Sequence, residues 1–286
     1  MATQPKQNPI LPDHINNKNE HPLKDFLILA IAVVLLISAV TWALASSASW
    51  LAPRIPYEWE LAWQDTSATT EQTSIDQPQQ QTELALQQLL EKLIGENALP
   101  VRVHYLADEA TPNAFATLGG HIFITRGLLE NVQSENGLAM VLAHEYAHIK
   151  LRHPMILALE QLSLGLILAL LGGDNIAQLV TQNTSMLTVL AFSRDMERAS
   201  DEYALQRLLA TYGHTSGADE FFKQIKKLEA KRSFSTTTET LDLMQTHPLT
   251  SERIEAIAAV TSIGELTPLV PQLKQQPNAE SQNPHN

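Results

Sequence analysis

The stretch VLAHEYAHIKLRHP, residues 141–154, places two histidines four positions apart, with a glutamate directly after the first. Residues i and i+4 of an α-helix lie on the same face, so His144 and His148 can offer their ring nitrogens to one metal ion. Glu145 lies next to the first histidine and can reach a water molecule bound to that ion. An ordinary helix can also contain this H-E-x-x-H pattern, so the rest of the chain must supply the missing parts.

A catalytic zinc site takes three protein ligands and keeps a fourth position for water. The best candidate for the third ligand is Glu197 in SRDMERASDEYA, with Asp201 one helical turn further to accept a hydrogen bond from a ligand histidine. Taken alone, these acids and the two nearby arginines would indicate a solvated helix face with local ion pairs. The Ala, Met and Tyr residues around them, and the need for one more ligand, favour the metal site.

Composition limits the classes of function. The chain has 286 residues, of which 44% are hydrophobic, enough for one large domain or two small ones with a sizeable core. Its net charge of −12 argues against a nucleic-acid partner, because phosphate binding needs a basic surface. The chain contains no cysteine, so a metal must be held by His, Asp or Glu.

One apolar run, Phe26–Ala45, predicts a transmembrane anchor. Its 20 residues carry no charge, and a helix of that length covers about 30 Å, the thickness of the hydrocarbon core of a bilayer. A cleaved signal peptide is the competing interpretation, but the run is long for a signal and begins after a largely polar stretch of 25 residues. Three lysines precede the run, whereas only Arg54 follows it before Lys92. This asymmetry predicts a protein of the bacterial inner membrane with a cytoplasmic N-terminus and a periplasmic domain.

The remaining pattern predicts an α+β fold that is mainly α-helical, with a small β-sheet behind the single transmembrane helix. ELALQQLLEKLI has helical spacing, VRVHYL alternates like a strand, and GGHIFITRGLL is typical of a strand that turns into a helix. The motif helix has Ser134 as its N-cap and is expected to stop at Pro154. Residues 155–171 predict a buried or membrane-touching helix. The expected organisation is a disordered N-terminus at 1–25, the anchor at 26–45, a folded domain at 50–262 with a flexible segment at 64–82, and a disordered tail at 263–286.

Five separate pieces of the chain together resemble a known family. They are IPYEWE, PNAFATLGGHIFITRGLL, VLAHEYAHIKLRHP, RDMERASDEYA and THPLTSERI. In this order they are similar to the membrane-associated HExxH zinc endopeptidases, which include CAAX prenyl proteases, HtpX peptidases and Oma-type quality-control peptidases. The resemblance covers roughly Ile55 to Ile257. It departs mildly at Thr117-Leu118, which replaces the more usual proline-containing link before the two glycines.

The resemblance implies zinc as the metal, held by the two motif histidines and Glu197 in a gluzincin-type domain. It implies Glu145 as the general base. It also places His247 near the metal, either to stabilise the oxyanion or to cap zinc as a removable fourth ligand. Arg253 would support that region.

For the substrate, the resemblance implies an extended polypeptide added as a strand to an edge strand, Gly119–Thr125, through main-chain hydrogen bonds. Gly119 and Gly120 would let the peptide approach closely. Asn113 and His121 would lie at the same cleft. Such a mode contacts the backbone more than the side chains, so it predicts broad specificity.

These expectations favour a membrane-anchored zinc endopeptidase that cleaves misfolded or damaged envelope proteins. The alternative is a metal-binding chaperone or assembly factor, whose latent zinc site His247 keeps closed. A CAAX-type protease acting on lipidated substrates is disfavoured, because that architecture needs many spanning helices and this chain has one clear span.

Overall fold

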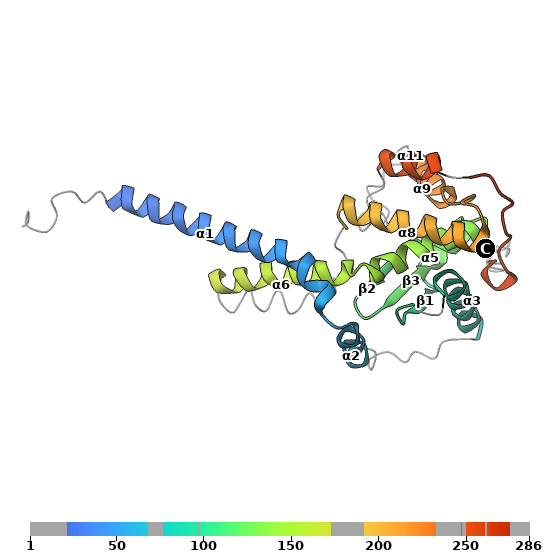
Figure 1. The fold of residues 1–286 in the computed structure, drawn as a ribbon, viewed down its shortest axis with the longest axis horizontal. Coiled ribbons are helices and arrows are strands. Elements are labelled where there is room, and N and C mark those ends of the chain that lie inside the picture. The colour runs from blue at the N-terminus through green and yellow to red at the C-terminus, as the bar shows by residue number, and fades with distance from the viewer. Residues whose placement is uncertain are drawn as a thin grey trace, which may run out of the picture.

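The computed structural model describes residues 22–67, 77–95, 98–172, 192–232, 247, 250–260 and 262–274. It confirms a mainly helical α+β fold, in which helices surround a small sheet and one long helix projects from the domain (Figure 1). The helices are α1 (Pro22–Leu51), α2 (Tyr57–Ser67), α3 (Gln77–Ile94), α4 (Arg126–Asn131), α5 (Glu135–Lys150), α6 (His153–Gly172), α8 (Arg194–Tyr212), α9 (Glu220–Arg232) and α11 (Ser251–Val260), with short 3₁₀ turns at Ala52–Arg54 and Pro271–Leu273. The strands are β1 (Arg102–Leu106), β2 (Ala114–Thr117) and β3 (His121–Thr125).

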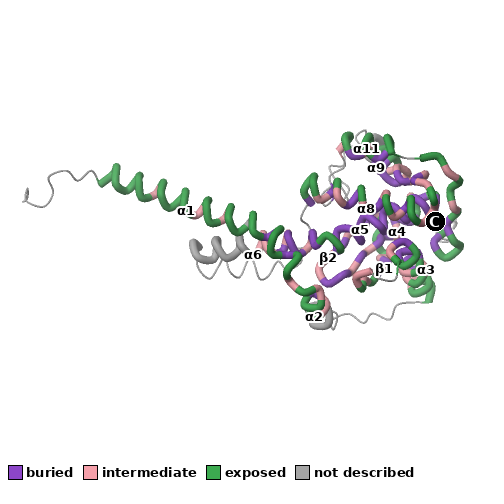
Figure 2. Tube along the Cα trace, viewed as in Figure 1, coloured by how far each residue is buried: buried purple, intermediate pink, exposed green. Residues whose placement is uncertain are grey.

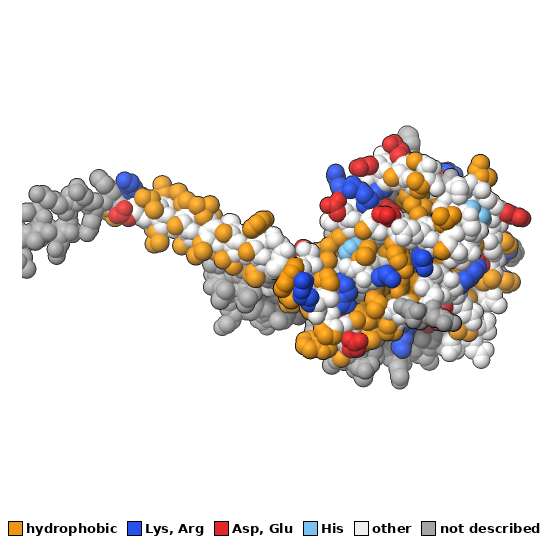
Figure 3. All heavy atoms as spheres, in the orientation of Figure 1, with side chains coloured by type: hydrophobic (Ala, Val, Ile, Leu, Met, Phe, Trp, Pro, Cys, Tyr) orange, Lys and Arg blue, Asp and Glu red, His pale blue; other side chains and the backbone are white. Residues whose placement is uncertain are grey.

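The projecting helix α1 is longer than the predicted anchor at 26–45. Most of its apolar side chains are exposed, and they cover the rod that Figures 2 and 3 show extending from the domain. By length and composition the helix can cross a membrane. The helix α6 leaves the domain beside the domain-proximal part of α1 (Figure 1).

The sheet has the strand order β1–β3–β2, with β1 parallel and β2 antiparallel to β3. The prediction that residues 119–125 form an edge strand is therefore wrong, because β3 pairs on both sides and β2 is the edge strand next to α5. The amide of Thr125 donates to the carbonyl of Asn113 at 3.1 Å. Hydrogen-bonded pairs alternate along an antiparallel ladder, so Ala114 and Ala116 direct their backbone groups away from β3.

The helix α5 forms the centre of the domain. All its residues from Glu135 to Ile149 are buried, because the helix packs against the sheet, α3 and α8. Ser134 caps it as predicted, since its Oγ accepts a hydrogen bond from the amide of Gly137 at 3.0 Å. The helix ends before the predicted stop, and Pro154 instead lies in the first turn of α6. A helix tolerates proline there because its first amides have no helical partner.

Two segments predicted to be flexible are partly ordered. The polar segment at 64–82 is helical at both ends, since α2 continues to Ser67 and α3 begins at Gln77; residues 68–76 lie outside the described part. The predicted tail packs on the domain up to residue 274, because Leu269 and Leu273 complete the hydrophobic core. The amide of Glu135 donates to the carbonyl of Thr267 at 2.8 Å. Residues 1–21 and 275–286 lie outside the described part.

Candidate metal centre

Three parts of the chain bring four metal-binding side chains together inside the domain. His144 and His148 come from α5, Glu197 from the first turns of α8, and His247 lies just before α11. One ligand atom from each lies within 4.8 Å of the others, and all four side chains are buried. Because α5 and α8 pack against each other, residues on facing sides of the two helices converge on one point.

The donor atoms are spaced as a tetrahedral metal ion requires. His144 Nε2 lies 3.0 Å from His148 Nε2 and 3.5 Å from Glu197 Oε2. His148 Nε2 lies 3.4 Å from Glu197 Oε1. Ligands bound to zinc at about 2.0–2.1 Å in a tetrahedron are separated by roughly 3.3–3.4 Å. Two imidazoles and one carboxylate are a donor set that zinc accepts, so these residues fit a zinc ion.

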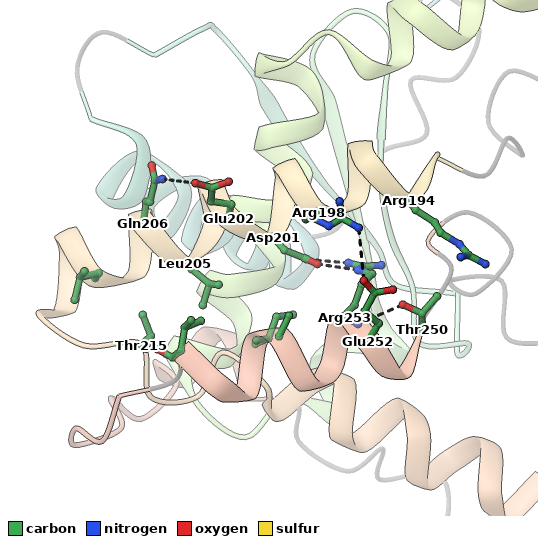
Figure 4. A pocket seen from close by; sticks show the side chains of 14 residues that line it. Arg194, Arg198, Asp201, Glu202, Leu205, Gln206, Thr215, Thr250, Glu252 and Arg253 are labelled. Carbon is green, nitrogen blue, oxygen red and sulfur yellow. Dashed lines mark hydrogen bonds and ion pairs between the residues drawn. The ribbon is translucent and has the colours of Figure 1, made fainter.

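Asp201, one helical turn after Glu197 in α8, orients one of the candidate ligands. Asp201 Oδ1 lies 2.9 Å from His144 Nδ1. Arg253 donates to both carboxylate oxygens of Asp201 at 2.8 Å, in the pairing between α8 and α11 that Figure 4 shows. With its Nδ1–H directed at Asp201, His144 presents the lone pair of Nε2 to the cluster. Arg253 also pairs with Glu197, so one guanidinium fixes both carboxylates.

Burial and ion pairing act against each other on the pKa values at the centre. In the centre without a metal, burial lowers the pKa of His144, but Asp201 and Glu197 outweigh it and raise that pKa to about 10; a metal that binds Nε2 therefore displaces a proton from it. Burial holds the pKa of His148 well below its ordinary value. For Glu197 and Asp201, burial raises the pKa, but the basic partners around them hold it below the usual range. Both acids are therefore anionic, which favours a bound cation.

The fourth member of the cluster lies between the candidate ligands and Glu145. His247 Nδ1 lies 3.0 Å from Glu197 Oε1 and 3.4 Å from His144 Nε2. Its Nε2 lies 3.6 Å from Glu145 Oε1. Glu145 Oε2 is buried and has no hydrogen-bond partner among the described residues. An unpaired, buried carboxylate oxygen is an available proton acceptor beside the donor cluster.

Two residues that contact His148 are not predicted as parts of the site. His153 is buried, and its Nδ1 lies 3.0 Å from His148 Nδ1. Phe192 covers the ring of His148, with ring centroids 3.8 Å apart. Together they fix the orientation of this imidazole. Helical periodicity does not predict either contact. His153 reaches the site through the turn between α5 and α6, and Phe192 lies before the start of α8.

The glycines expected to bind substrate form the turn between β2 and β3. Gly119 and Gly120 have φ values of 84° and 78°, a conformation that favours glycine. The expectation that Gly120 leaves room for a peptide is wrong, because a Cβ there would collide with the hydroxyl of Tyr57. Asn113 precedes β2, and its buried Oδ1 has no hydrogen-bond partner in the described part of the chain.

The structure places His121 on the face of the sheet opposite α5. Strand residues alternate between faces, and Ile122 and Ile124 are buried on the core side. On the other side, His121 Nδ1 lies 2.7 Å from His104 Nε2. Burial is the main cause that lowers the pKa of His121 to about 4. The sheet therefore separates this side chain from the metal cluster.

A cavity of about 400 Å³ lies between α8 and α11 (Figure 4). The ion pair of Asp201 and Arg253 forms part of its wall, together with apolar side chains such as Leu205 and Ile257 and with further polar ones such as Glu202. None of the four candidate ligands lines it, and neither does Glu145. A substrate in this cavity would therefore not meet the donor cluster.

Comparisons with known proteins agree with this geometry. The sequence profile of Peptidase family M48 matches residues 79–261, which include the whole donor cluster. The chain is 30% identical over 181 residues to the mitochondrial metalloendopeptidase OMA1 of Schizosaccharomyces pombe, covering 62% of this chain and 52% of that protein. It is 29% identical over 161 residues to OMA1 of Saccharomyces cerevisiae, covering 54% and 45%. It is 41% identical over 86 residues to a protease HtpX homolog of Ralstonia nicotianae, covering 29% and 30%. The chain thus spans about half the length of the two OMA1 proteins.

Proposed function

The chain belongs to peptidase family M48, and on that premise we propose that it is a membrane-anchored, zinc-dependent endopeptidase. Its proposed substrates are misfolded or damaged polypeptides of the bacterial cell envelope. One observation carries the proposal: a buried cluster of four donors with an unpaired carboxylate oxygen of Glu145 beside it. The names of the relatives, two metalloendopeptidases and one protease, support the same class of reaction. Digestion of unfolded casein by the detergent-purified chain, beside Glu145→Gln, tests it.

In the proposed mechanism, His144, His148 and Glu197 hold the metal. Zinc bound there supplies Lewis acidity that polarises a peptide carbonyl and makes a water molecule more acidic. Glu145 Oε2 accepts a proton from the attacking water as the water oxygen bonds to the carbonyl carbon. Glu145 then gives this proton to the leaving nitrogen as the C–N bond breaks. One water is consumed, and the glutamate returns to its starting form.

The edge strand β2 is the proposed docking site for the substrate. Ala114 and Ala116 direct their backbone groups away from β3, so an extended peptide can add to the sheet there by main-chain hydrogen bonds. β2 also packs on α5, the helix of the two histidines. Asn113, at the start of this edge, is proposed to contact the peptide through its unpaired Oδ1. Recognition through the backbone suits substrates of varied sequence.

Both apolar helices are proposed to enter the bilayer. The end of α1 and the start of α6 share one apolar cluster, in which Ala48 packs with Met155. At about 1.5 Å per residue, Leu162 lies roughly 10 Å further along α6, in the direction from which α1 comes (Figure 1). Residues 162–171 contain no charge. We infer that α6 dips into the membrane beside the anchor, with the N-terminus cytoplasmic and the domain periplasmic.

Single cysteines test this placement, because the natural chain has none. Leu162 and Leu209 are exposed to similar extents, 58% and 53%, but lie on α6 and α8. In spheroplasts, a membrane-impermeant maleimide is expected to label Leu209→Cys, whereas Leu162→Cys should react only after detergent is added. Equal labelling of both would place α6 in water. Labelling of neither residue before lysis would indicate the opposite topology, with the domain in the cytoplasm.

The position of His247 favours a second candidate, a chaperone or assembly factor with a closed zinc site. Its Nδ1 lies among the ligand atoms and fits the fourth corner of a tetrahedron, where an active peptidase admits water. In the peptidase proposal the same contact represents a latent state, in which the histidine must leave before a substrate is cut.

Replacing His247 with alanine separates these roles. For a latent peptidase capped by this side chain, kcat/KM for casein is expected to rise by about tenfold, a gain of ~1.4 kcal/mol. A side chain that instead stabilises the oxyanion would make the variant slower by about 10²- to 10³-fold. If neither the wild type nor the variant cuts casein while both bind zinc, the chaperone candidate is correct.

A further inference from the structure

The segment between the anchor and the domain, residues 52–60, contributes buried side chains to the fold although the family match begins only at residue 79. Ala52 is fully buried and Glu60 is 4% exposed. A segment that served only as a tether would have no reason to bury a carboxylate, because desolvating a charge is costly unless it is paired. The partners of this segment therefore indicate what it does.

The buried Glu60 joins two separate parts of the site. Its carboxylate forms an ion pair with Arg152, directly after the helix of the two histidines, and accepts a hydrogen bond from the amide of Gly119. Arg152 also donates to the carbonyl of Ile55 at 2.7 Å. Burial raises the pKa of Glu60, although the arginine and the amide act in the opposite direction. One side chain thus links the end of α5 to the turn between β2 and β3.

The second contact is made by Tyr57, one helical turn earlier. Its hydroxyl donates to the carbonyl of Pro100 at 2.9 Å and fills the space that a side chain at Gly120 would need. The carbonyl of Gly120 in turn accepts from the amide of Arg102 at 2.8 Å. The tyrosine therefore contacts the turn at Gly120 and the segment that leads into β1.

Apolar contacts connect residues 52–60 also to the start of α8, which carries Glu197. Ile55 and Leu118 pack against the cluster formed by the end of α1 and the start of α6. Met196 packs against the same cluster and directly precedes the candidate ligand Glu197. The β2–β3 turn, α6 and the start of α8 thus meet on the segment that leaves the membrane.

The backbone of Arg152 shows that this junction is specified rather than incidental. Its φ is 64°, the only positive value at a non-glycine residue in the described part of the chain. A non-glycine residue in this region costs about 1–2 kcal/mol. Such a conformation persists where surrounding contacts determine it, and here they are the pairs with Glu60 and Ile55.

We propose that Tyr57 and Glu60 are positioning residues, which hold the β2–β3 hairpin against α5 so that the substrate edge and the metal ligands keep a fixed relation. The inference rests on the proposed function for its catalytic consequence, but the structural coupling can be tested without any activity. Residues 52–60 would then be needed for substrate docking as well as for attachment to α1. The orientation of the substrate edge would depend on contacts made by the segment that follows α1.

Hydrogen exchange of the metal-free, detergent-purified full chain tests the coupling. Glu60→Gln is expected to speed exchange of amides in residues 113–121 by about tenfold, while α8 and α3 keep their wild-type rates. Tyr57→Phe removes only the hydroxyl and should show the same pattern to a smaller extent. Two matched controls, Glu135→Gln and Tyr212→Phe, also change one partly or fully buried polar group each but lie in a separate contact at the start of α5. They should leave the hairpin unchanged.

Kinetics on casein then measure the catalytic consequence. Misplacing the edge weakens docking, so Glu60→Gln is expected to raise KM by about tenfold and change kcat by less than about twofold, with the metal content unchanged. Exchange in the hairpin equal to that of the wild type in both Glu60→Gln and Tyr57→Phe would overturn the proposal. If Glu60→Gln fails to fold, Tyr57→Phe decides alone. Faster hairpin exchange in a chain that cleaves nothing would keep the coupling and reject the peptidase.

Discussion

Glu145→Gln is expected to lower kcat/KM for unfolded casein by about 10³-fold while the variant keeps its fold and its metal. The amide has the same shape as the carboxylate but cannot accept the proton of the attacking water, and general base catalysis contributes roughly 10²- to 10⁴-fold. The wild-type carboxylate has an oxygen that is buried and unpaired among the described residues, so no other hydrogen bond is lost through that atom. The measurement is the initial rate of casein digestion by detergent-purified protein.

A matched substitution shows that the effect comes from the site. Glu220→Gln changes a glutamate that caps the start of α5 through Ser134, in the same domain but away from the donor cluster. Its activity is expected to remain within about twofold of the wild type, after correction for any unfolded fraction. Full activity of Glu145→Gln, with metal content equal to that of the wild type, would reject the assignment of the base.

Removal of the metal is expected to have the second large effect, on stability and on activity together. A ligand present at about 1,000 times its Kd contributes ~4 kcal/mol to the free energy of unfolding. Chelation should therefore lower the Tm and stop casein cleavage, and added zinc should restore both. The cause is electrostatic: without a cation, Glu197 and the three histidines around it remain buried together, and only neighbouring side chains such as Asp201 and Arg253 balance their charges.

The control for metal removal is His148→Ala, which takes away a fully buried side chain of the proposed ligand set. This variant is expected to bind less than one zinc per chain and to show no further change in Tm when the chelator is added. Glu145→Gln should respond to the chelator as the wild type does, because the base is not a ligand. An unchanged Tm and unchanged cleavage after complete removal of metal from the wild type would contradict the metal centre.

The centre of the site follows from local sequence because it depends on helical periodicity. The spacing of His144 and His148, and of Glu197 and Asp201, places each pair on one helix face wherever the helices lie. The cysteine-free composition limits the donors further. The structure brings these residues within contact distance, as the pattern predicts. The anchor follows equally directly, because spanning a bilayer requires a long uncharged run.

Features that depend on contacts between distant segments could not be predicted from local sequence patterns. Strand order is one case, since residues 119–125 have the same alternating pattern at an edge or in the centre of a sheet. The ordered segment at 262–274 is another, because its few leucines become significant only when the core leaves space for them. His153 and Phe192 reach His148 only through the path of the backbone between helices.

By itself the sequence indicated the helices, the apolar run of the proposed anchor and three of the candidate metal ligands, because these depend on local patterns in the chain. Only the tertiary structure decided that β2 is the edge strand beside α5, that His153 contacts His148, and that Glu60 pairs with Arg152. The physical reason is that local geometry fixes which side chains share a face. Packing and charge burial across long sequence separations determine which faces meet.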